Sequence, residues 1–274
     1  MKAEQPFASA RAVLATQHGK ARAIAPAFAR RLGLAVVETH IDTDAFGSFT
    51  GEVPRTGTAL DAAIAKARAG MAATGSPLGL ASEGSFGPHP WLPFGAAGVE
   101  TLVFIDDARG LVIHETRLSR RTNYARLELG AAADVPAFLA RAGFPAHALV
   151  VRGADGAVLA KGVQDETALA RLRPQASALE TDMRAHLNPT RMAAIRSVAV
   201  RLAARLATPC PACGSPGFGE VAPRPGLPCN DCRQPTALAA GLAVTCPACG
   251  HVEDRPRPDG RTAASPADCS WCNP

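Results

Sequence analysis

Eight cysteines form four Cys-x-x-Cys pairs near the end of the 274-residue chain, and the first 209 residues contain none. A Cys-x-x-Cys turn directs two thiolates at one point, so two turns complete a closed tetrahedral zinc site. Four copies of the motif fit metal ligation better than thiol exchange, the redox alternative. The pattern predicts two structural zinc sites. Their expected ligands are Cys210, Cys213, Cys229, Cys232, Cys246, Cys249, Cys269 and Cys272.

The spacing of the motifs does not decide which of them share an ion. Intervening segments of 15, 13 and 19 residues suit sequential, nested or interleaved pairing. We expect sequential pairing, in which neighbouring motifs form tandem zinc ribbons. In any arrangement the tail is too small to bury a self-sufficient core, so metal binding should supply much of its folding free energy.

A disulfide framework is the alternative reading of these cysteines, and it requires an oxidising compartment. The N-terminus lacks a basic start followed by an apolar stretch and a cleavage site, so we expect a reduced, cytoplasmic protein. No uninterrupted apolar run approaches the roughly 18 residues that a membrane helix needs, so we expect no membrane association.

The charge of the cysteine-rich tail bears on its partners. Residues 209–274 carry five arginines and six acidic residues. Each four-cysteine zinc site adds a net charge of about −2, which makes the tail anionic and poorly suited to a phosphate backbone. Nucleic acid is therefore not an expected partner, whereas a protein partner bound by the zinc ribbons stays open.

Upstream of the cysteines, short apolar runs alternate with amphipathic stretches. An apolar run at 11–15 predicts a strand, and the next segment predicts a helix with Ile24, Phe28 and Leu32 on one face and Gly33 as its cap. Further expected strands are 34–37, 78–82, 101–105, 111–115, 148–151 and 157–161, and further expected helices are 59–71 and 133–142. This order predicts an α/β fold, a mixed sheet with flanking helices, plus a small C-terminal zinc-ribbon module.

We expect three parts along the chain. They are an α/β domain over 1–178, which is a candidate for nucleotide binding, a polar segment and connecting helix over 179–208, and a double four-cysteine zinc-ribbon domain over 209–274. The connecting helix should begin at Pro189 with Asn188 as its N-cap. One face should pack inward, while the arginines on the other face can stay solvated.

Charged and polar side chains concentrate where the polar segment meets this helix. Asp182, His186, Asn188 and Arg191 are therefore candidate substrate-binding residues. A surface salt-bridge cluster is the structural alternative for the same pattern.

The turn at 16–20 lies between a predicted strand and a predicted helix. Unpaired backbone N–H groups and the positive end of the helix dipole can bind phosphate at such a position. Lys20 would add a compact positive charge, and Thr16, Gln17 and His18 are candidate substrate-binding residues beside it. A capped helix with an exposed lysine is the structural alternative.

Residues 12–24 resemble the first motif of the purine nucleoside triphosphate pyrophosphatases that act on inosine and xanthosine triphosphates. That motif places Thr or Ser, Asn and Lys after the first strand. Thr16 and Lys20 match it, and Gln17 or His18 stands in place of the asparagine.

Two further segments carry the same resemblance. Residues 57–68 are similar to a helix whose carboxylates help to hold magnesium; Asp61 and Lys66 match, and Leu60 replaces a neighbouring acid. Residues 80–84 resemble the strand-end acid and glycine of that family, with Glu83 as the acid. The complete sequence, including 180–190 and the terminal Cys-Asn-Pro, looks like an uncharacterised bacterial domain family of unknown function, which implies no activity.

The resemblance to the pyrophosphatases implies a magnesium-dependent hydrolase that releases diphosphate from a nucleoside triphosphate. Its expected catalytic residues are Lys20, as the phosphate clamp, and Asp61 and Glu83, as magnesium ligands. Such chemistry needs charge neutralisation on the phosphates, a metal held by carboxylates and an oriented water. Glu52 could hold a further water or metal contact.

The replaced asparagine and the replaced acid favour a second hypothesis. In it, the protein is a non-catalytic adaptor that senses a nucleotide or another phosphorylated small molecule, or binds a protein through its zinc ribbons. A third hypothesis, nucleic-acid binding by the ribbons, is disfavoured by the charge of the tail.

Overall fold

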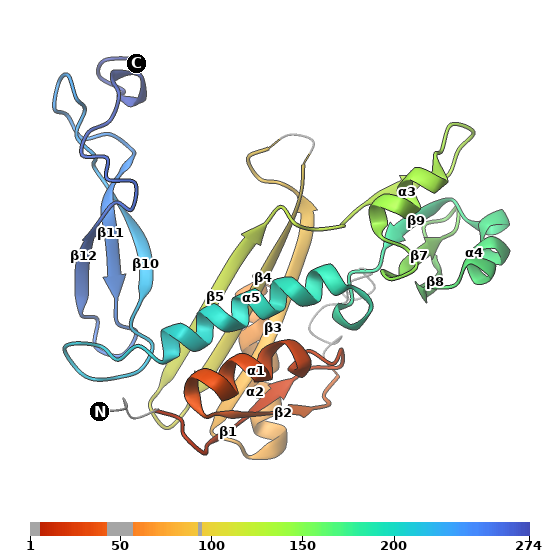
Figure 1. Cartoon of the computed structure of the whole chain (residues 1–274), viewed down its shortest axis with the longest axis horizontal. Helices are drawn as coiled ribbons and strands as arrows, with labels where there is room; N and C mark the ends of the chain where they lie inside the picture. The colour runs from red at the N-terminus through yellow and green to blue at the C-terminus, as the bar shows by residue number, and fades with distance from the viewer. Residues whose placement is uncertain (1–5, 43–56, 93–94) are drawn as a thin grey trace. The chain divides into compact units, whose positions relative to one another are not determined.

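The computed structural model describes residues 6–42, 57–92 and 95–274 (Figure 1). The chain divides into two compact units, Met1–Ala203 and Ala204–Pro274. Within the described residues, every helix is too short or too polar to cross a membrane.

A five-stranded mixed sheet of order β2–β1–β3–β4–β5 forms the centre of the first unit. Its strands are β1 (Arg11–Ala15), β2 (Ala35–Thr39), β3 (Leu78–Pro88), β4 (Ala96–Asp106) and β5 (Leu111–Ser119). β1 runs parallel to β2 and β3, whereas β3, β4 and β5 form an antiparallel meander. The mixed α/β fold expected from the sequence is confirmed.

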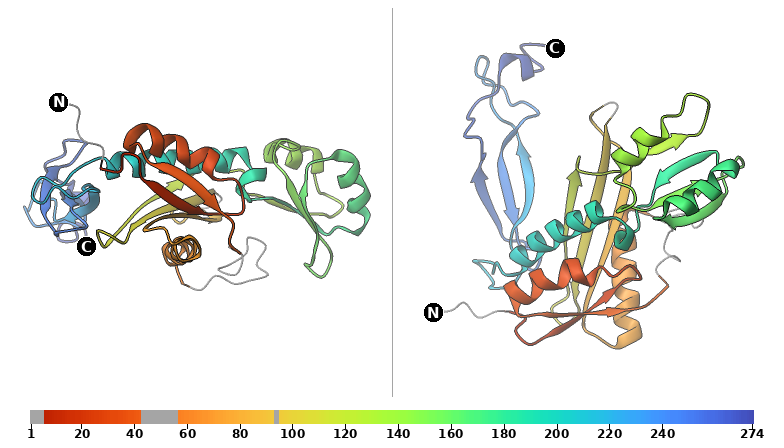
Figure 2. Two further views of the ribbon diagram at one scale, coloured as in Figure 1. Left: turned by 90° about the horizontal axis from the view of Figure 1, so that it is seen from below. Right: turned by 45° about the vertical axis from the view of Figure 1, so that its right-hand side comes forward.

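Two helices connect the parallel strands: α1 (Ala21–Leu32) links β1 to β2, and α2 (Ala59–Thr74) precedes β3. They cover opposite faces of the sheet (Figure 2). The chain therefore leaves β1 on one side and reaches β3 on the other. The carboxyl end of β1, where its pairing with β3 stops at Leu80, is a topological switch point, which is where open α/β sheets bind ligands.

The α2 face of the sheet is packed with small side chains. Ala63, Ala67 and Met71 of α2 form a buried cluster with residues of β1, β3 and β4. Gly79 of β3 allows this close approach, because a Cβ at that position would lie 2.5 Å from the Met71 side chain. The opposite face is filled by larger residues, among them Phe28 and Phe104, whose rings lie 6.5 Å apart.

A smaller four-stranded sheet of order β6–β9–β7–β8 completes the first unit. Its strands are β6 (Arg126–Glu128), β7 (Leu149–Arg152), β8 (Val158–Val163) and β9 (Ala178–Thr181). Helices α3 (Val135–Ala142) and α4 (Glu166–Leu172) pack on it around Phe138 and Leu169. Two 3-10 turns, η2 (Arg173–Gln175) and η3 (Ala185–Leu187), lie on either side of β9 in the chain.

Helix α5 (Pro189–Leu206) follows, and it lies on the same side of the five-stranded sheet as α1 (Figure 2). Its start is the one expected: the Asn188 side chain accepts a hydrogen bond from the Arg191 amide at 3.0 Å, as an N-cap does.

Sequence patterns located most helices and strands, but they underestimated the length of several strands. The strand expected over 78–82 is too short, because β3 continues to Pro88 and pairs along its whole length with β4. Glycine and proline are tolerated there because, among the described residues, no strand pairs with this side of β3 beyond Leu80. The short elements β6, α4 and β9 were not expected, since each is too brief to show a period.

The second unit contains a three-stranded antiparallel sheet, β10 (Glu220–Pro225), β11 (Ala239–Thr245) and β12 (Val252–Pro256). A 3-10 turn, η4 (Pro266–Asp268), follows the sheet. Its small core consists of Phe218 and Val244 packed against Cys210 and Cys246.

Candidate functional site

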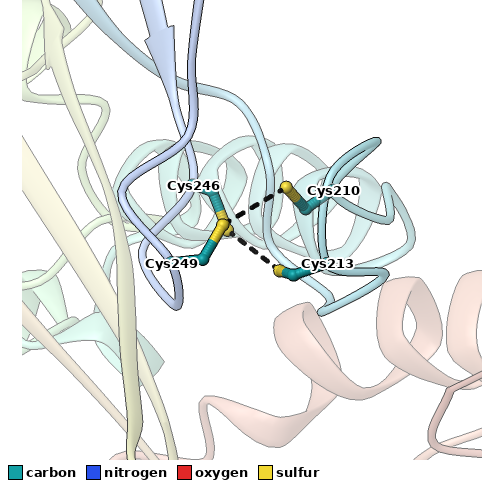
Figure 3. A group of neighbouring side chains, drawn as sticks. All are labelled: Cys210, Cys213, Cys246 and Cys249. Carbon is teal, nitrogen blue, oxygen red and sulfur yellow. Dashed lines mark hydrogen bonds between the residues drawn. The ribbon is translucent and has the colours of Figure 1, made fainter.

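The eight cysteines gather into two groups of four whose sulfur atoms lie within 4.8 Å of one another. One group contains Cys210, Cys213, Cys246 and Cys249 (Figure 3), and the other contains Cys229, Cys232, Cys269 and Cys272. The first motif therefore pairs with the third and the second with the fourth. The expectation of sequential ribbons is wrong.

Strand pairing in the second unit explains the interleaved arrangement. Glu220, at the start of β10, lies opposite Thr245, at the end of β11, so the motifs before β10 and after β11 meet at one end of the sheet. Pro225 lies opposite Ala239 at the other end, where the second motif connects the two strands. β12 ends at this same end of the sheet, since Pro256 pairs with Gly241, and the fourth motif follows β12 in the chain.

The distances between sulfurs fit zinc. Cys210 and Cys249 lie 3.8 Å apart, and the corresponding pair Cys229 and Cys272 also lies 3.8 Å apart. A zinc tetrahedron with bonds of about 2.3 Å has edges of about 3.8 Å, whereas a disulfide requires about 2.05 Å. Four thiolates would fill each shell, so these sites suit a structural rather than a catalytic ion.

The first three cysteine motifs also share a backbone hydrogen bond and a left-handed residue. The amides of Gly214, Arg233 and Gly250 donate to the carbonyls of the first cysteine of their motifs, at 2.9, 3.2 and 3.1 Å. All three residues have positive φ, at 72°, 62° and 72°. Arg233 thus adopts a left-handed conformation where the other two motifs use glycine.

A second candidate site lies in the first unit, at the carboxyl end of β1 and the middle of β3, just beyond Leu80, where the two strands stop pairing. Lys20, which is 7% exposed, donates from Nζ to the main-chain carbonyl of Ser82 at 3.0 Å. That carbonyl is available because the β1–β3 pairing ends at Leu80. Gly19, with φ of 58°, allows the turn that brings Lys20 back under the strand ends.

Two buried ion pairs stand next to this lysine. Lys66 Nζ of α2 lies 2.6 Å from Glu83 Oε2, and Arg191 Nε of α5 lies 2.6 Å from Glu100 Oε1. Glu83 pairs across the sheet with Thr101, and Gly84 pairs with Glu100, so the two carboxylates belong to opposite faces. An ion pair therefore lies on each face of the sheet at this part of β3.

Gly84 provides the space for the second ion pair. A Cβ at this position would lie 2.5 Å from Arg191 Nη2 and 2.7 Å from Glu100 Oε1. The Arg191 guanidinium also lies over the Phe86 ring, 5.2 Å from its centroid. Glycine at 84 is thus required by the approach of the guanidinium to the strand.

The surroundings of Lys20 and His18 disfavour the protonated, positively charged forms of both side chains. Burial and the neighbouring Arg191 lower the pKa of Lys20 to about 7, although Glu100 and Glu83 oppose this fall. Burial and the positive charge of Lys20 lower the pKa of His18 to about 3. His18 is therefore neutral at physiological pH, and Lys20 exchanges its proton near neutrality.

Two buried polar atoms of this region lack a hydrogen-bond partner among the described residues, Ser82 Oγ and Glu100 Oε2. Buried polar atoms are normally hydrogen-bonded, to protein, ordered water or ligand. Their presence beside Lys20 and Arg191 is consistent with a site that a polar ligand completes.

Several residues proposed from the sequence meet here. His18 stacks on His186 with ring centroids 4.9 Å apart, and Thr16 Oγ1 closes the turn by accepting from the His18 amide at 3.2 Å. Burial of the His186 ring lowers its pKa as well. Gln17 is exposed, and its amide donates to the Ile41 carbonyl at 2.7 Å, which holds the turn to the segment after β2.

Asp61, proposed as a magnesium ligand, has a different role. Its carboxylate accepts from the Thr58 amide at 2.9 Å and from the Thr58 hydroxyl, and its own amide donates to Thr58 Oγ1. This reciprocal contact is a capping box at the start of α2. The hydrogen bonds from Thr58 also lower the pKa of the exposed Asp61. We therefore withdraw Asp61 from the catalytic set, and Glu52 lies outside the described residues.

Asp182 and Asn188 are also engaged within the protein. Asp182 accepts from the Arg184 guanidinium at 2.6 Å and from the Gly162 amide at 3.0 Å. Asn188 caps α5 and donates to the Asp182 carbonyl at 3.0 Å. Both side chains are buried, so the structure shows them joining β9 and α5 rather than facing a ligand.

The arginines of α5 differ from the solvated face that the pattern predicted. Arg191 is 2% exposed and Arg205 is 9% exposed. Arg191 is held by Glu100, and Arg205 donates to the Gly217 carbonyl at 3.1 Å. The sequence pattern predicted that both arginines are exposed to solvent, because helical periodicity cannot reveal a buried carboxylate or carbonyl that a distant segment supplies.

Glu100 and Ser82 were missed. Glu100 interrupts an otherwise largely apolar strand, and it shares a sheet face with the buried Leu102 and Phe104. A lone acid at an inward position of a core strand is the signal that could have identified it. Lys66 was noted from the resemblance but had been given no role.

Comparison with known proteins shows the family of the chain. Residues 66–274 match a family described as a domain of unknown function, DUF6671. This match covers most of the chain, so the chain belongs to that family. No curated protein matches the sequence.

Proposed function

We propose that this member of the DUF6671 family binds the polyphosphate of a nucleoside triphosphate where β1 ends beside β3 and hydrolyses a phosphoanhydride bond. The carrying observation is the buried Lys20 ammonium, fixed by the Ser82 carbonyl at a topological switch point. The resemblance of 12–24 and 80–84 to purine nucleoside triphosphate pyrophosphatases supports the same reading.

In the proposed reaction, a water oxygen attacks the α-phosphorus and the bond to the bridging oxygen of the β-phosphate breaks. Diphosphate leaves, and the water proton is released to a base or to solvent. The charge that builds up on the phosphates is met by Lys20 and Arg191, which need no reorganisation because Ser82 and Glu100 already hold them. Neutral His18 can donate or accept a hydrogen bond at the same turn.

Magnesium, when it accompanies the nucleotide, would supply further charge neutralisation. The described residues contain only the two cysteine groups as clusters of three or more potential ligands, so the protein offers no dedicated magnesium cage in this part. Mg²⁺ is commonly held by one or two carboxylates together with substrate phosphates. Glu83 is the buried carboxylate that fits this requirement, and it keeps its proposed role as a ligand.

The direct test is turnover by the full-length protein with a panel of nucleoside triphosphates, including those of inosine and xanthosine, in the presence of Mg²⁺. Diphosphate and nucleoside monophosphate should appear in equal amounts. Lys20→Met and Glu83→Gln should each lower kcat/KM by roughly 10²-fold or more. Lys161→Met, at an exposed lysine of β8, is the matched control and should retain full activity.

A folded, zinc-loaded protein that turns over none of these nucleotides would overturn the hydrolase proposal. The same experiment bears on a second candidate, a non-catalytic nucleotide sensor, which the capping role of Asp61 favours because it leaves the site with fewer acids. Saturable nucleotide binding without diphosphate release would select the sensor.

A further inference from the structure

A separate pocket of about 320 Å³ lies between α5 and the edge strand β5. Its lining includes Glu100, Arg117, Arg121, Ala194 and Ser197, and Lys20, Ser82 and Glu83 are not part of it. Small-molecule sites begin at about 300 Å³, so the pocket has room for a ligand of modest size. Glu100 is the residue that this pocket shares with the site at β1 and β3.

Glu100 is the buried charged residue among those that line the pocket, and we call its position the floor of the pocket. Glu100 is 3% exposed, and its Oε1 accepts from Arg191 Nε at 2.6 Å. Within the described residues its Oε2 has no hydrogen-bond partner. A buried carboxylate oxygen without a hydrogen-bond donor is unfavourable, and an N–H group from a ligand would supply the missing donor.

The rim of the pocket carries positive charge and hydrogen-bond donors. Arg117 donates from Nη1 to the Ser197 hydroxyl across the gap between β5 and α5. The Arg121 amide donates to Ser119 Oγ at 3.1 Å, which fixes the backbone that carries its guanidinium. Two guanidinium groups beside serine hydroxyls are the donor set that suits a phosphate group.

The positions of Glu100 and of the two arginines determine how a ligand would be oriented in the pocket. A phosphate placed at the floor would be repelled by Glu100 and would lose its hydration, whereas at the rim it meets two exposed arginines. An N–H donor placed at the floor meets a carboxylate that lacks one. A matching ligand therefore carries its N–H group and its phosphate at opposite ends.

We propose that this pocket binds a nucleoside monophosphate, with a base N–H donating to Glu100 and the phosphate held by Arg117 and Arg121. The ligand is thereby in contact with the carboxylate that also positions Arg191. The site is distinct from the one at β1 and β3, and binding there does not depend on the proposed hydrolysis.

Titration calorimetry of the full-length protein with guanosine monophosphate tests the proposal. Saturable binding is expected, and Arg121→Glu should weaken it by at least tenfold. Ala194→Phe, which places a ring in the pocket, should do the same. Arg120→Glu, at the exposed neighbour that does not line the pocket, and Lys20→Met should leave affinity within twofold.

A change in the ligand tests the contact with Glu100 without disturbing the buried ion pair. Purine riboside monophosphate lacks an N–H donor on its base edge, so it should bind at least tenfold more weakly than guanosine monophosphate. Inorganic phosphate should bind more weakly still.

Three results would overturn the inference. They are no saturable binding of guanosine monophosphate up to millimolar concentration, unchanged binding in both Arg121→Glu and Ala194→Phe, or equal binding of the purine riboside analogue. Binding that Lys20→Met abolishes would place the nucleotide at β1 and β3 instead, and would also overturn it. Absence of turnover changes none of these measurements, so failure of the proposed function is distinguishable.

Discussion

Lys20 in the turn after β1 donates from Nζ to the carbonyl of Ser82 in β3, 3.0 Å away. A buried ammonium thus joins the carboxyl end of β1 to β3, just beyond Leu80, where the two parallel strands stop pairing. Burial and Arg191 lower its pKa to about 7, so the group is poised to take up a proton when an anion binds.

The stability of the protein should depend on pH through Lys20. Its pKa is about 7 in the folded protein against an ordinary value of 10.5, so between these values the unfolded chain binds the additional proton. The free energy of unfolding of the wild type should therefore rise with pH in this window relative to Lys20→Met, and their difference should be constant below pH 7. Urea unfolding of both proteins from pH 6 to 10 measures this difference. A flat difference across the range contradicts the burial of a charged lysine.

Replacement of Gly84 by alanine should break the Arg191–Glu100 pair, because the new Cβ would lie 2.5 Å from the guanidinium. We expect a loss of about 3 kcal/mol in the free energy of unfolding. Gly87→Ala in the same strand is the control, since its Cβ meets nothing within 4 Å, and it should change stability by less than about 0.5 kcal/mol. Equal effects of the two substitutions in chemical denaturation would show that space at Gly84 is not limiting.

Zinc counting by native mass spectrometry should report the interleaved pairing. Cys210→Ser combined with Cys246→Ser removes ligands from one group and should cost one ion. Cys210→Ser combined with Cys229→Ser removes one ligand from each group and should reduce occupancy at both sites. Sequential pairing predicts the reverse pattern for the second pair of substitutions, because Cys210 and Cys229 would then share an ion.

Arg233 offers a stabilising substitution in the zinc unit. Its φ of 62° is strained for a residue with a Cβ, whereas Gly214 and Gly250 hold the same place in other motifs without that strain. Arg233→Gly should stabilise this unit by about 1 kcal/mol after the added flexibility of the unfolded chain is subtracted. Gly214→Ala should lower stability by about the same amount. Thermal unfolding of the zinc-loaded protein checks both, and a destabilised Arg233→Gly protein would show that the arginine side chain matters more than the backbone.

Local patterns in the sequence predicted those features that local chemistry decides. The cysteine motifs identified all eight grouped thiols, and Asn188 followed by Pro189 identified the start of α5. Each signal lies within a few residues of the structure it produces. The same is true of Gly33, whose left-handed φ of 65° ends α1 as expected.

Features that depend on distant segments could not be predicted in this way. The partner of each cysteine motif is set by the pairing of Glu220 with Thr245, and the spacing of the motifs carries no record of it. Asp61 is a different case, because its partner Thr58 lies only three residues earlier and the capping-box spacing is present in the sequence itself. Arg191 is buried because Glu100 reaches it from a strand 91 residues away in the sequence.

Calorimetric titration of a non-hydrolysable nucleoside triphosphate analogue into wild-type protein and Lys20→Met at pH 8 tests the central claim most directly. A phosphate bound at Lys20 raises the pKa of the ammonium from about 7, so the wild type should take up a proton on binding, seen as a dependence of the heat on buffer. Lys20→Met should bind at least roughly tenfold more weakly and without this proton. Equal affinity of the two proteins, with no proton uptake by either, would contradict a polyphosphate site where β1 ends beside β3.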